Sequence, residues 1–220
     1  MGMLDVKDIA IYGAGGFGKE VACLINRINE HESQWNLIGF FDDAKLKGYK
    51  VSHFGVVLGG INELNDWPTD LGSAIAIGDP KARLFVRQRI RSAHIKFPNL
   101  VHPSLQIADF KTFAIGEGNI IQGDCSVSCD IVIGDFNVLN GSVALGHDAK
   151  VGDFNVIMPD TRISGEVIIG DCNLIGVGSI ILQQIVIGNN VTLGAGAVLL
   201  TKPKNGNTYI GNPARLFKYN

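Results

Sequence analysis

The sequence has 220 residues, of which 46% are hydrophobic and 18% charged, and its formal net charge is −2. This length suits one large domain or two smaller ones. Because no basic run and no long apolar run occur, we expect no nucleic acid partner and no membrane partner. The N-terminus lacks a charged stretch followed by an apolar segment, so we expect a cytoplasmic protein.

The chain begins with the pattern of a nucleotide-binding unit. Ile9–Tyr12 is a short apolar strand, residues 13–18 read Gly-Ala-Gly-Gly-Phe-Gly, and residues 19–29 have the apolar spacing of a helix. Glycines let the backbone turn tightly and approach a phosphate, and the N-terminus of a helix favours an anion. A second strand at residues 37–41 is followed by two acids, where a ribose hydroxyl is usually bound. We therefore expect nucleotide contacts at Gly13, Gly15, Gly16, Phe17, Asp42 and Asp43. The alternative is an ordinary loop followed by two solvated acids.

Further strands are predicted at residues 56–58 and 74–78, and a helix at residues 81–91. The arginines of this helix should form a solvated face: Arg83, Arg87, Arg89 and Arg91. We place the first domain at residues 1–103 and expect an α/β, half-Rossmann fold. About one hundred residues hold one nucleotide-binding half and not two, which weakens an NAD hypothesis.

A repeat dominates the rest of the chain. Every sixth residue from Ile115 to Leu199 is Ile, Leu or Val, fifteen positions in all, and Gly follows at five positions spaced 18 apart. Six-residue units nested in an 18-residue period predict three short strands per coil of a parallel β-helix. Neither an α-helix nor an ordinary strand has this spacing. We therefore expect five coils, within a second domain at residues 104–220.

A second inward-facing row lies four residues after each aliphatic position. One of its columns should stack as an internal amide ladder that stops at Val191: Asn119, Asn137, Asn155 and Asn173. Cys125 falls in this row, so it should be a buried thiol, whereas Cys129 and Cys172 fall outside it. We expect no metal site, because zinc sites need paired Cys and His ligands.

His147 is the one histidine within the repeat, and this register points it outward. Gly165 lies one coil away in the same column, where it leaves space and an exposed N–H beside the imidazole. Asp148 follows directly. An imidazole can take a proton from an amine or hydroxyl near neutral pH, and an amide can stabilise an oxyanion. This group favours acyl transfer over the alternative of an incidental surface histidine.

The chain resembles the hexapeptide-repeat sugar acyltransferases of the sialic-acid O-acetyltransferase and UDP-amino-sugar N-acetyltransferase type. The resemblance is carried by the glycine loop, Asp42-Asp43, Leu58-Gly59-Gly60, Ile77-Gly78-Asp79, His102-Pro103-Ser104, Asn140, His147-Asp148 and Gly211-Asn212-Pro213-Ala214. It implies a left-handed β-helix and a homotrimer, with the nucleotide held by the N-terminal domain. It also implies that His147 is the general base, that Asp148 orients it and that Asn140 touches the acceptor. Acyl-CoA is expected along Gly176, Gly194, Gly211, Pro213 and Ala214, although the last three have an alternative as a polar cap on the final coil.

Two residues depart from the pattern of that family. Phe17 stands where the glycine loop usually carries a histidine, and Val156 replaces a second histidine that is common in the coil after the base. The first departure concerns the acceptor and the second concerns one contact to acyl-CoA.

The leading functional hypothesis is transfer of an acyl group, expected to be acetyl from acetyl-CoA, to a nucleotide-linked sugar. A UDP-linked amino sugar is favoured because a neutral amine is a better nucleophile than a hydroxyl. A zinc hydratase on the same helix would need about three histidine ligands, and the coils offer one. An NAD-binding redox protein and a catalytically silent scaffold are the remaining alternatives.

Overall fold

The computed structural model describes residues 6–218. The chain separates into two compact units. The first contains the described residues up to Gly78 and Ala82–Pro103, and the second contains Asp79–Lys81 and the residues from Ser104 onward. Within residues 6–218, no helix is long and apolar enough to cross a membrane.

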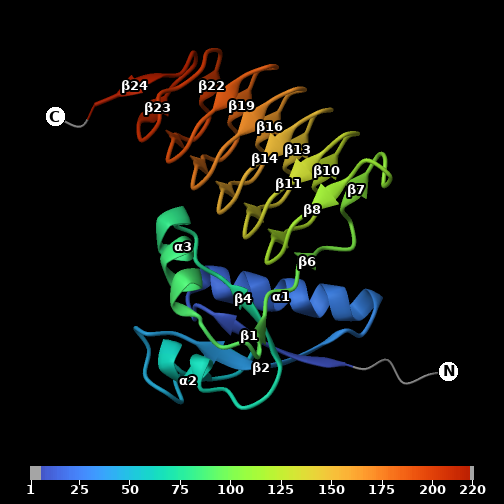
Figure 1. Cartoon of the computed structure of the whole chain (residues 1–220), viewed down its shortest axis with the longest axis vertical. Coiled ribbons are helices and arrows are strands. Elements are labelled where there is room, and N and C mark those ends of the chain that lie inside the picture. Colours follow the sequence, from blue (N-terminus) through green and yellow to red (C-terminus); the bar gives the residue numbers. More distant parts are fainter. Residues whose placement is uncertain (1–5, 219–220) are drawn as a thin grey trace. The chain divides into compact units, whose positions relative to one another are not determined.

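The first unit is built on a parallel sheet with the strand order β3-β2-β1-β4-β5, of which Figure 1 labels β1, β2 and β4. β1 lies at its centre, where Ile9, Ala10 and Ile11 are fully buried, and it pairs with β2 on one side and β4 on the other. The elements of this part are β1 (Lys7–Tyr12), α1 (Gly16–His31), β2 (Trp35–Phe41), β3 (Val57–Gly59), α2 (Ile61–Asn65), β4 (Leu71–Ile75), α3 (Pro80–Arg89), β5 (Ile95–Lys96) and β6 (Leu100–Val101).

Several details of this unit differ from the sequence prediction. β4 begins three residues earlier than expected, because Gly72 to Ile75 pair with Ile9 to Tyr12. The short helix α2 had no prediction. β4 and β5 extend the sheet beyond the three strands of a single nucleotide-binding half, so the number of strands does not by itself argue against a dinucleotide.

The predicted solvated face of arginines is wrong for Arg83 and holds for Arg91, which is exposed. Arg83 is fully buried and donates a hydrogen bond to the carbonyl of Ile75. Arg87 lies 4.4 Å from the ring centroid of Phe97, and Arg89 pairs with Asp43. Helical spacing alone predicts these arginines to lie on the surface, because their partners lie outside the helix, at Ile75, Phe97 and Asp43.

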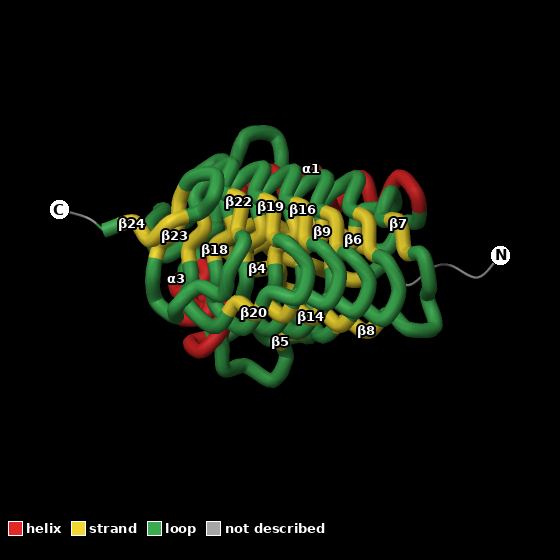
Figure 2. Tube along the Cα trace, turned by 90° about the horizontal axis from the view of Figure 1, so that it is seen from above, coloured by secondary structure: helices red, strands yellow, loops and turns green. Residues whose placement is uncertain are grey.

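The second unit is a parallel β-solenoid, and Figure 2 shows its successive coils side by side. Fifteen two-residue strands, from β8 to β22 at three per coil, form the five predicted coils. They are β8 (Ala114–Ile115), β9 (Ile120–Ile121), β10 (Ser126–Val127), β11 (Val132–Ile133), β12 (Val138–Leu139), β13 (Ala144–Leu145), β14 (Lys150–Val151), β15 (Val156–Ile157), β16 (Arg162–Ile163), β17 (Ile168–Ile169), β18 (Leu174–Ile175), β19 (Ile180–Ile181), β20 (Val186–Ile187), β21 (Thr192–Leu193) and β22 (Val198–Leu199).

The solenoid is longer than the regular repeat. β7 (Gln106–Ile107) precedes it and pairs with β10, while β23 (Thr208–Ile210) follows it and pairs with β21. β24 (Arg215–Phe217) then turns back antiparallel to β23. β23 thus joins the stack without keeping the six-residue spacing of the repeat.

The six-residue unit has a local cause at the corners. Three residues after most of the buried aliphatic positions, the backbone takes a left-handed conformation, with φ of 59° at Asp148 and 66° at Gly196. Asp, Asn and Gly tolerate this conformation better than most residues, which explains their frequency at the corners. Each corner turns the chain into the next strand and closes a triangular coil.

The asparagine ladder is confirmed. Asn137, Asn155 and Asn173 are fully buried, and each donates a side-chain hydrogen bond of 2.9–3.2 Å to the asparagine one coil below. The ladder ends where expected, since only the backbone N–H of Val191 reaches Asn173. Cys125 is also buried in this row, and burial raises the pKa of its thiol to about 11.

Candidate functional site

The glycine loop of the first unit has two kinds of glycine. A Cβ at Gly13 would lie 2.6 Å from the carbonyl oxygen of Ala76, and one at Gly18 would lie 2.0 Å from the carbonyl oxygen of Gly13. These two glycines are therefore needed for packing within the fold. Gly15 and Gly16 are exposed at the start of α1, and a Cβ on either would meet no atom within 4 Å. The open side of the loop leaves room for a phosphate at the N-terminus of the helix.

Asp42 is occupied by the protein itself. Its Oδ2 accepts a hydrogen bond of 2.7 Å from the N–H of Ala14, and its Oδ1 accepts one of 2.8 Å from the N–H of Ala44. The carboxylate therefore ties the glycine loop to the end of β2. That Asp42 binds a ribose stays a prediction. The hydrogen bonds in this structure show that it holds the glycine loop in place.

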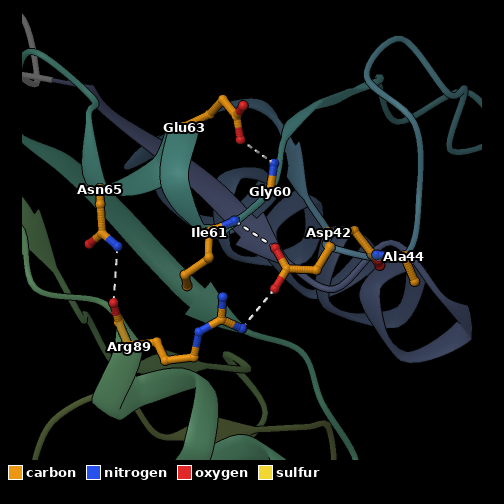
Figure 3. Close-up of polar contacts among 8 residues, drawn as sticks. Asp42, Ala44, Gly60, Ile61, Glu63, Asn65 and Arg89 are labelled. Carbon is orange, nitrogen blue, oxygen red and sulfur yellow. Dashed lines mark hydrogen bonds and ion pairs between the residues drawn. The ribbon is translucent and has the colours of Figure 1, made fainter.

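Asp43 lies in a second network, which sequence analysis did not anticipate, and Figure 3 labels two of its partners, Ile61 and Arg89. It accepts hydrogen bonds of 2.7 Å from the N–H of Ile61 and 2.9 Å from Arg89, and the hydroxyl of Tyr12 also donates to it. Burial alone would raise the pKa of Asp43, but these three donors lower it overall. Burial, together with the neighbouring carboxylate, raises the pKa of the Tyr12 phenol. Asp43 thus joins β1, the start of α2 and the end of α3.

In the solenoid, His147 and Asp148 form the predicted pair. Nδ1 of His147 lies 2.8 Å from Oδ2 of Asp148, and both side chains are more than half exposed. Since an ionised carboxylate only accepts hydrogen bonds, Nδ1 carries the proton and Nε2 is left as an acceptor. The left-handed backbone at Asp148 returns its carboxylate towards the preceding imidazole.

Gly165 lies directly against this imidazole. A Cβ at Gly165 would be 2.5 Å from Nε2 of His147 and 2.7 Å from Cε1, so no other residue fits without moving the ring. The N–H of Gly165 has no hydrogen-bond partner within residues 6–218. Glu166 connects the two coils, because its N–H donates a 2.8 Å hydrogen bond to the carbonyl of His147.

Asn140 directly follows β12, one corner before β13 and His147. It is nine-tenths buried, and its side-chain nitrogen is used within the coil, at 3.3 Å from the carbonyl of Ile157 and 3.6 Å from the sulfur of Met158. A contact with an acceptor would therefore go through the side-chain oxygen. That role stays a prediction.

The glycines expected along acyl-CoA have structural reasons of their own. A Cβ at Gly176 would lie 2.6 Å from the backbone of the next coil, and one at Gly194 would lie 2.7 Å from Ile210. The segment Gly211–Ala214 bends over the last coil, where Val198 donates to the carbonyl of Gly211 and accepts from the N–H of Ala214. Pro213 follows a cis peptide bond. These contacts hold the end of the solenoid, and they leave the acyl-CoA role as a prediction.

Among residues 6–218, no three His, Cys, Asp or Glu side chains gather where they could hold a metal ion. His147 has Asp148 as its one acidic partner, and Cys125 is buried.

Comparison with known proteins shows which proteins the chain is similar to. The PglD N-terminal domain family matches residues 8–90. The acetyltransferase domain of PglB from Neisseria gonorrhoeae has a TM-score of 0.86 and 29% sequence identity, with 96% of this chain and 100% of that chain covered. The chain is therefore similar to the hexapeptide-repeat sugar acyltransferases, in its first domain by sequence and over nearly its whole length by fold. The same PglB domain has also been solved in complex with acetyl coenzyme A.

Two further relatives add detail. UDP-N-acetylbacillosamine N-acetyltransferase of Bacillus subtilis is 31% identical over 118 residues, which is 53% of this chain and 51% of that protein, so the match spans about half of the relative. Perosamine N-acetyltransferase from Caulobacter crescentus, solved with CoA and GDP-perosamine, covers 99% of this chain with a TM-score of 0.85. Its identity is 21%, so this likeness supports a common fold alone.

Proposed function

We propose that this chain is an acyl-CoA-dependent N-acyltransferase whose acceptor is a nucleotide-linked amino sugar. The observation that carries the proposal is one corner of the solenoid, where Asp148 holds Nδ1 of His147 and Nε2 lies over the bare Cα of Gly165. The B. subtilis relative is named for a UDP-linked sugar, and the PglB domain was solved with acetyl coenzyme A. These relatives favour acetyl-CoA as co-substrate and a UDP-amino sugar as acceptor.

In the proposed mechanism, the amine of the acceptor attacks the thioester carbonyl of acyl-CoA. Nε2 of His147 accepts the amine proton as the C–N bond forms, and the carboxylate of Asp148 stabilises the resulting imidazolium. The N–H of Gly165 donates to the oxyanion. The C–S bond then breaks, and the CoA thiolate leaves with the proton that His147 returns. Atoms and charges balance without a metal ion.

Nucleotide binding is assigned to the first unit. The open N–H groups around Gly15 and Gly16 suit a diphosphate at the start of α1. Asp42 holds the loop in the shape that exposes those groups, while Phe17, half-buried beside them, offers an apolar surface and no hydrogen bond. We include a homotrimer in the proposal, because exposed apolar side chains on the solenoid are typical of a surface that another copy of the chain covers.

The proposal is tested by mass spectrometry of products from acetyl-CoA and a panel of UDP-, GDP- and dTDP-linked amino sugars, with the matching hydroxy sugars as controls. Acetylation of at least one amino sugar, and slower or no acetylation of its hydroxy analogue, is the expected result. Absence of transfer to every nucleotide sugar would contradict the transferase assignment, and preferred transfer to hydroxy sugars would contradict N-acylation.

A further inference from the structure

A groove crosses the outer face of one sheet of the solenoid at its N-terminal end. Its volume is about 480 Å³, and its lining comes from three neighbouring strands, β7, β10 and β13, which pair side by side in that order. This volume lies within the usual range for sites of small molecules, about 300–1,000 Å³.

The chemistry of this sheet face changes along the solenoid. In the groove, the side chains next to the buried aliphatic residues are small or polar: Gln106, Ala108, Ser126 and Ser128. Towards the C-terminal end, the corresponding side chains are Ile180, Leu182 and Leu200, which are 39–47% exposed. β13 lies at the boundary between the two halves, and His147 follows it.

The groove reaches the proposed base. Ser128 donates its N–H to the carbonyl of Leu145, and the next residue, Cys129, accepts a 3.0 Å hydrogen bond from the N–H of Asp148. The end of β10 therefore lies directly beside the turn that carries His147. Gly146 lies opposite Ser128 and has no side chain, so no side chain of that residue separates the Ser128 hydroxyl from the turn.

The groove offers hydrogen-bonding groups that the protein does not use. Within residues 6–218, neither the hydroxyl of Ser126 nor the side-chain amide of Gln106 has a partner, and Ser128 makes only a 3.9 Å contact with the sulfur of Cys129. Sugar rings present several hydroxyl and amide groups, which need such partners when they leave water. The apolar half of the same face offers none.

We propose that this groove holds the sugar ring of the acceptor, with Ser128 nearest the amine and Ser126 and Gln106 farther along the ring. This assignment rests on the proposed function and names the residues that select the sugar. The acceptor then approaches His147 from the N-terminal coils, and acyl-CoA approaches from the side of Gly165.

The test compares two substitutions of equal size at one position. Ser128→Val removes the hydroxyl and Ser128→Thr keeps it, while Ser126→Leu fills the groove. We expect Ser128→Val and Ser126→Leu to raise KM for the nucleotide sugar at least about tenfold, as is usual for a blocked or unpaired pocket. KM for acetyl-CoA should stay within about twofold, and Ser128→Thr should lie close to the parent. Lys150→Leu, on another face of the same coils, is the matched control.

Calorimetry separates this inference from the transferase assignment, because it needs no turnover. The parent should bind the nucleotide sugar more tightly than the nucleotide alone, and Ser126→Leu should abolish that difference. Equal binding of the two ligands by the parent, or unchanged sugar KM and affinity in both groove variants, would overturn the assignment. Dissociation of the oligomer by Ser126→Leu, with both KM values changed, would make the groove a contact between copies and would also overturn it.

Discussion

At the scale of single residues, the proposed chemistry depends on which nitrogen of His147 is free. Asp148 accepts the hydrogen bond from Nδ1, and this fixes Nε2 as the proton acceptor. The two residues are adjacent in sequence, and a left-handed backbone at the second one brings the carboxylate back to the ring. A lone histidine thus acquires an orienting partner without a second element of the fold.

His147→Ala should lower kcat by roughly 10² or more, since that is the usual contribution of a positioned base. The oligomer should stay intact, because the side chain is more than half exposed. Asp148→Asn should have a smaller effect in the same direction, because an amide can still orient the ring but cannot stabilise its charge. Steady-state kinetics with size-exclusion chromatography measure both effects, and near-full activity of His147→Ala would end its assignment as the base.

Gly165 should not tolerate a side chain. A Cβ there would lie 2.5 Å from Nε2 of His147 and would displace the imidazole. Gly165→Val should therefore fold and assemble but lose turnover, and even Gly165→Ala should be strongly impaired. Gly178→Ala is the control. A Cβ there meets no atom within 4 Å, so the φ of +65° can affect folding stability but no neighbouring side chain is displaced. Parent-like activity of Gly165→Val would show that the oxyanion role is wrong.

At the scale of elements, the asparagine ladder holds neighbouring coils in register. Asn155 donates to Asn137 at 3.0 Å and to the carbonyl of Gly170 at 2.8 Å, and it accepts two hydrogen bonds from Asn173. Asn155→Val should fit sterically, since Val191 occupies the same column. It should nevertheless lower the free energy of unfolding by about 2–4 kcal/mol, because buried groups lose their partners. Denaturant titration measures this loss, with the exposed Lys150→Ala as control, and a fully stable Asn155→Val would contradict the ladder's role.

The solenoid could be predicted from the sequence and the polar networks of the first unit could not. Each coil repeats the environment of the previous one, so spacing alone specifies which residues face inward, and Cys125 was placed correctly on that basis. Asp43 bonds to Ile61 and Arg89, which are 18 and 46 positions away in the sequence, and no local sequence pattern predicts such pairs. The burial of Arg83 was missed because it depends on how α3 packs, which the spacing of apolar residues along the helix does not reveal.

The hydrogen bonds of Asp42 determine why the substitution Asp42→Ala should weaken nucleotide binding. Asp42→Ala should weaken UDP or UDP-sugar binding by loosening the loop at Ala14, and not by removing a ligand contact. Hydrogen exchange at Ala14 should therefore become faster in the variant even without nucleotide, while the control Asp8→Ala, at the other end of β1, should leave it unchanged. The parent should show no NAD binding by calorimetry. Tight NAD binding with no response to nucleotide sugars would revive the redox alternative, which the strand order of the sheet permits.

At the scale of the whole molecule, the groups proposed to bind the acceptor come from both units. The coils carry no insertion that could grip a nucleotide, since their 18-residue period is unbroken from Ile115 to Leu199. We therefore propose that the glycine loop recognises the nucleotide and that the solenoid carries the proposed base and the proposed sugar groove.

The last prediction concerns assembly. Ile180, Leu182 and Leu200 expose apolar surface on neighbouring strands and turns of one sheet face, and a second copy of the chain would cover it. We expect light scattering to give a mass of about 71 kDa, three times the chain mass of 23.6 kDa. Leu182→Glu should shift the mass towards the single chain, because a buried carboxylate without a partner is costly. Lys150→Glu, which also adds an exposed acid on a different face, should leave the trimer intact. A parent protein that is monomeric at micromolar concentration would contradict the homotrimer.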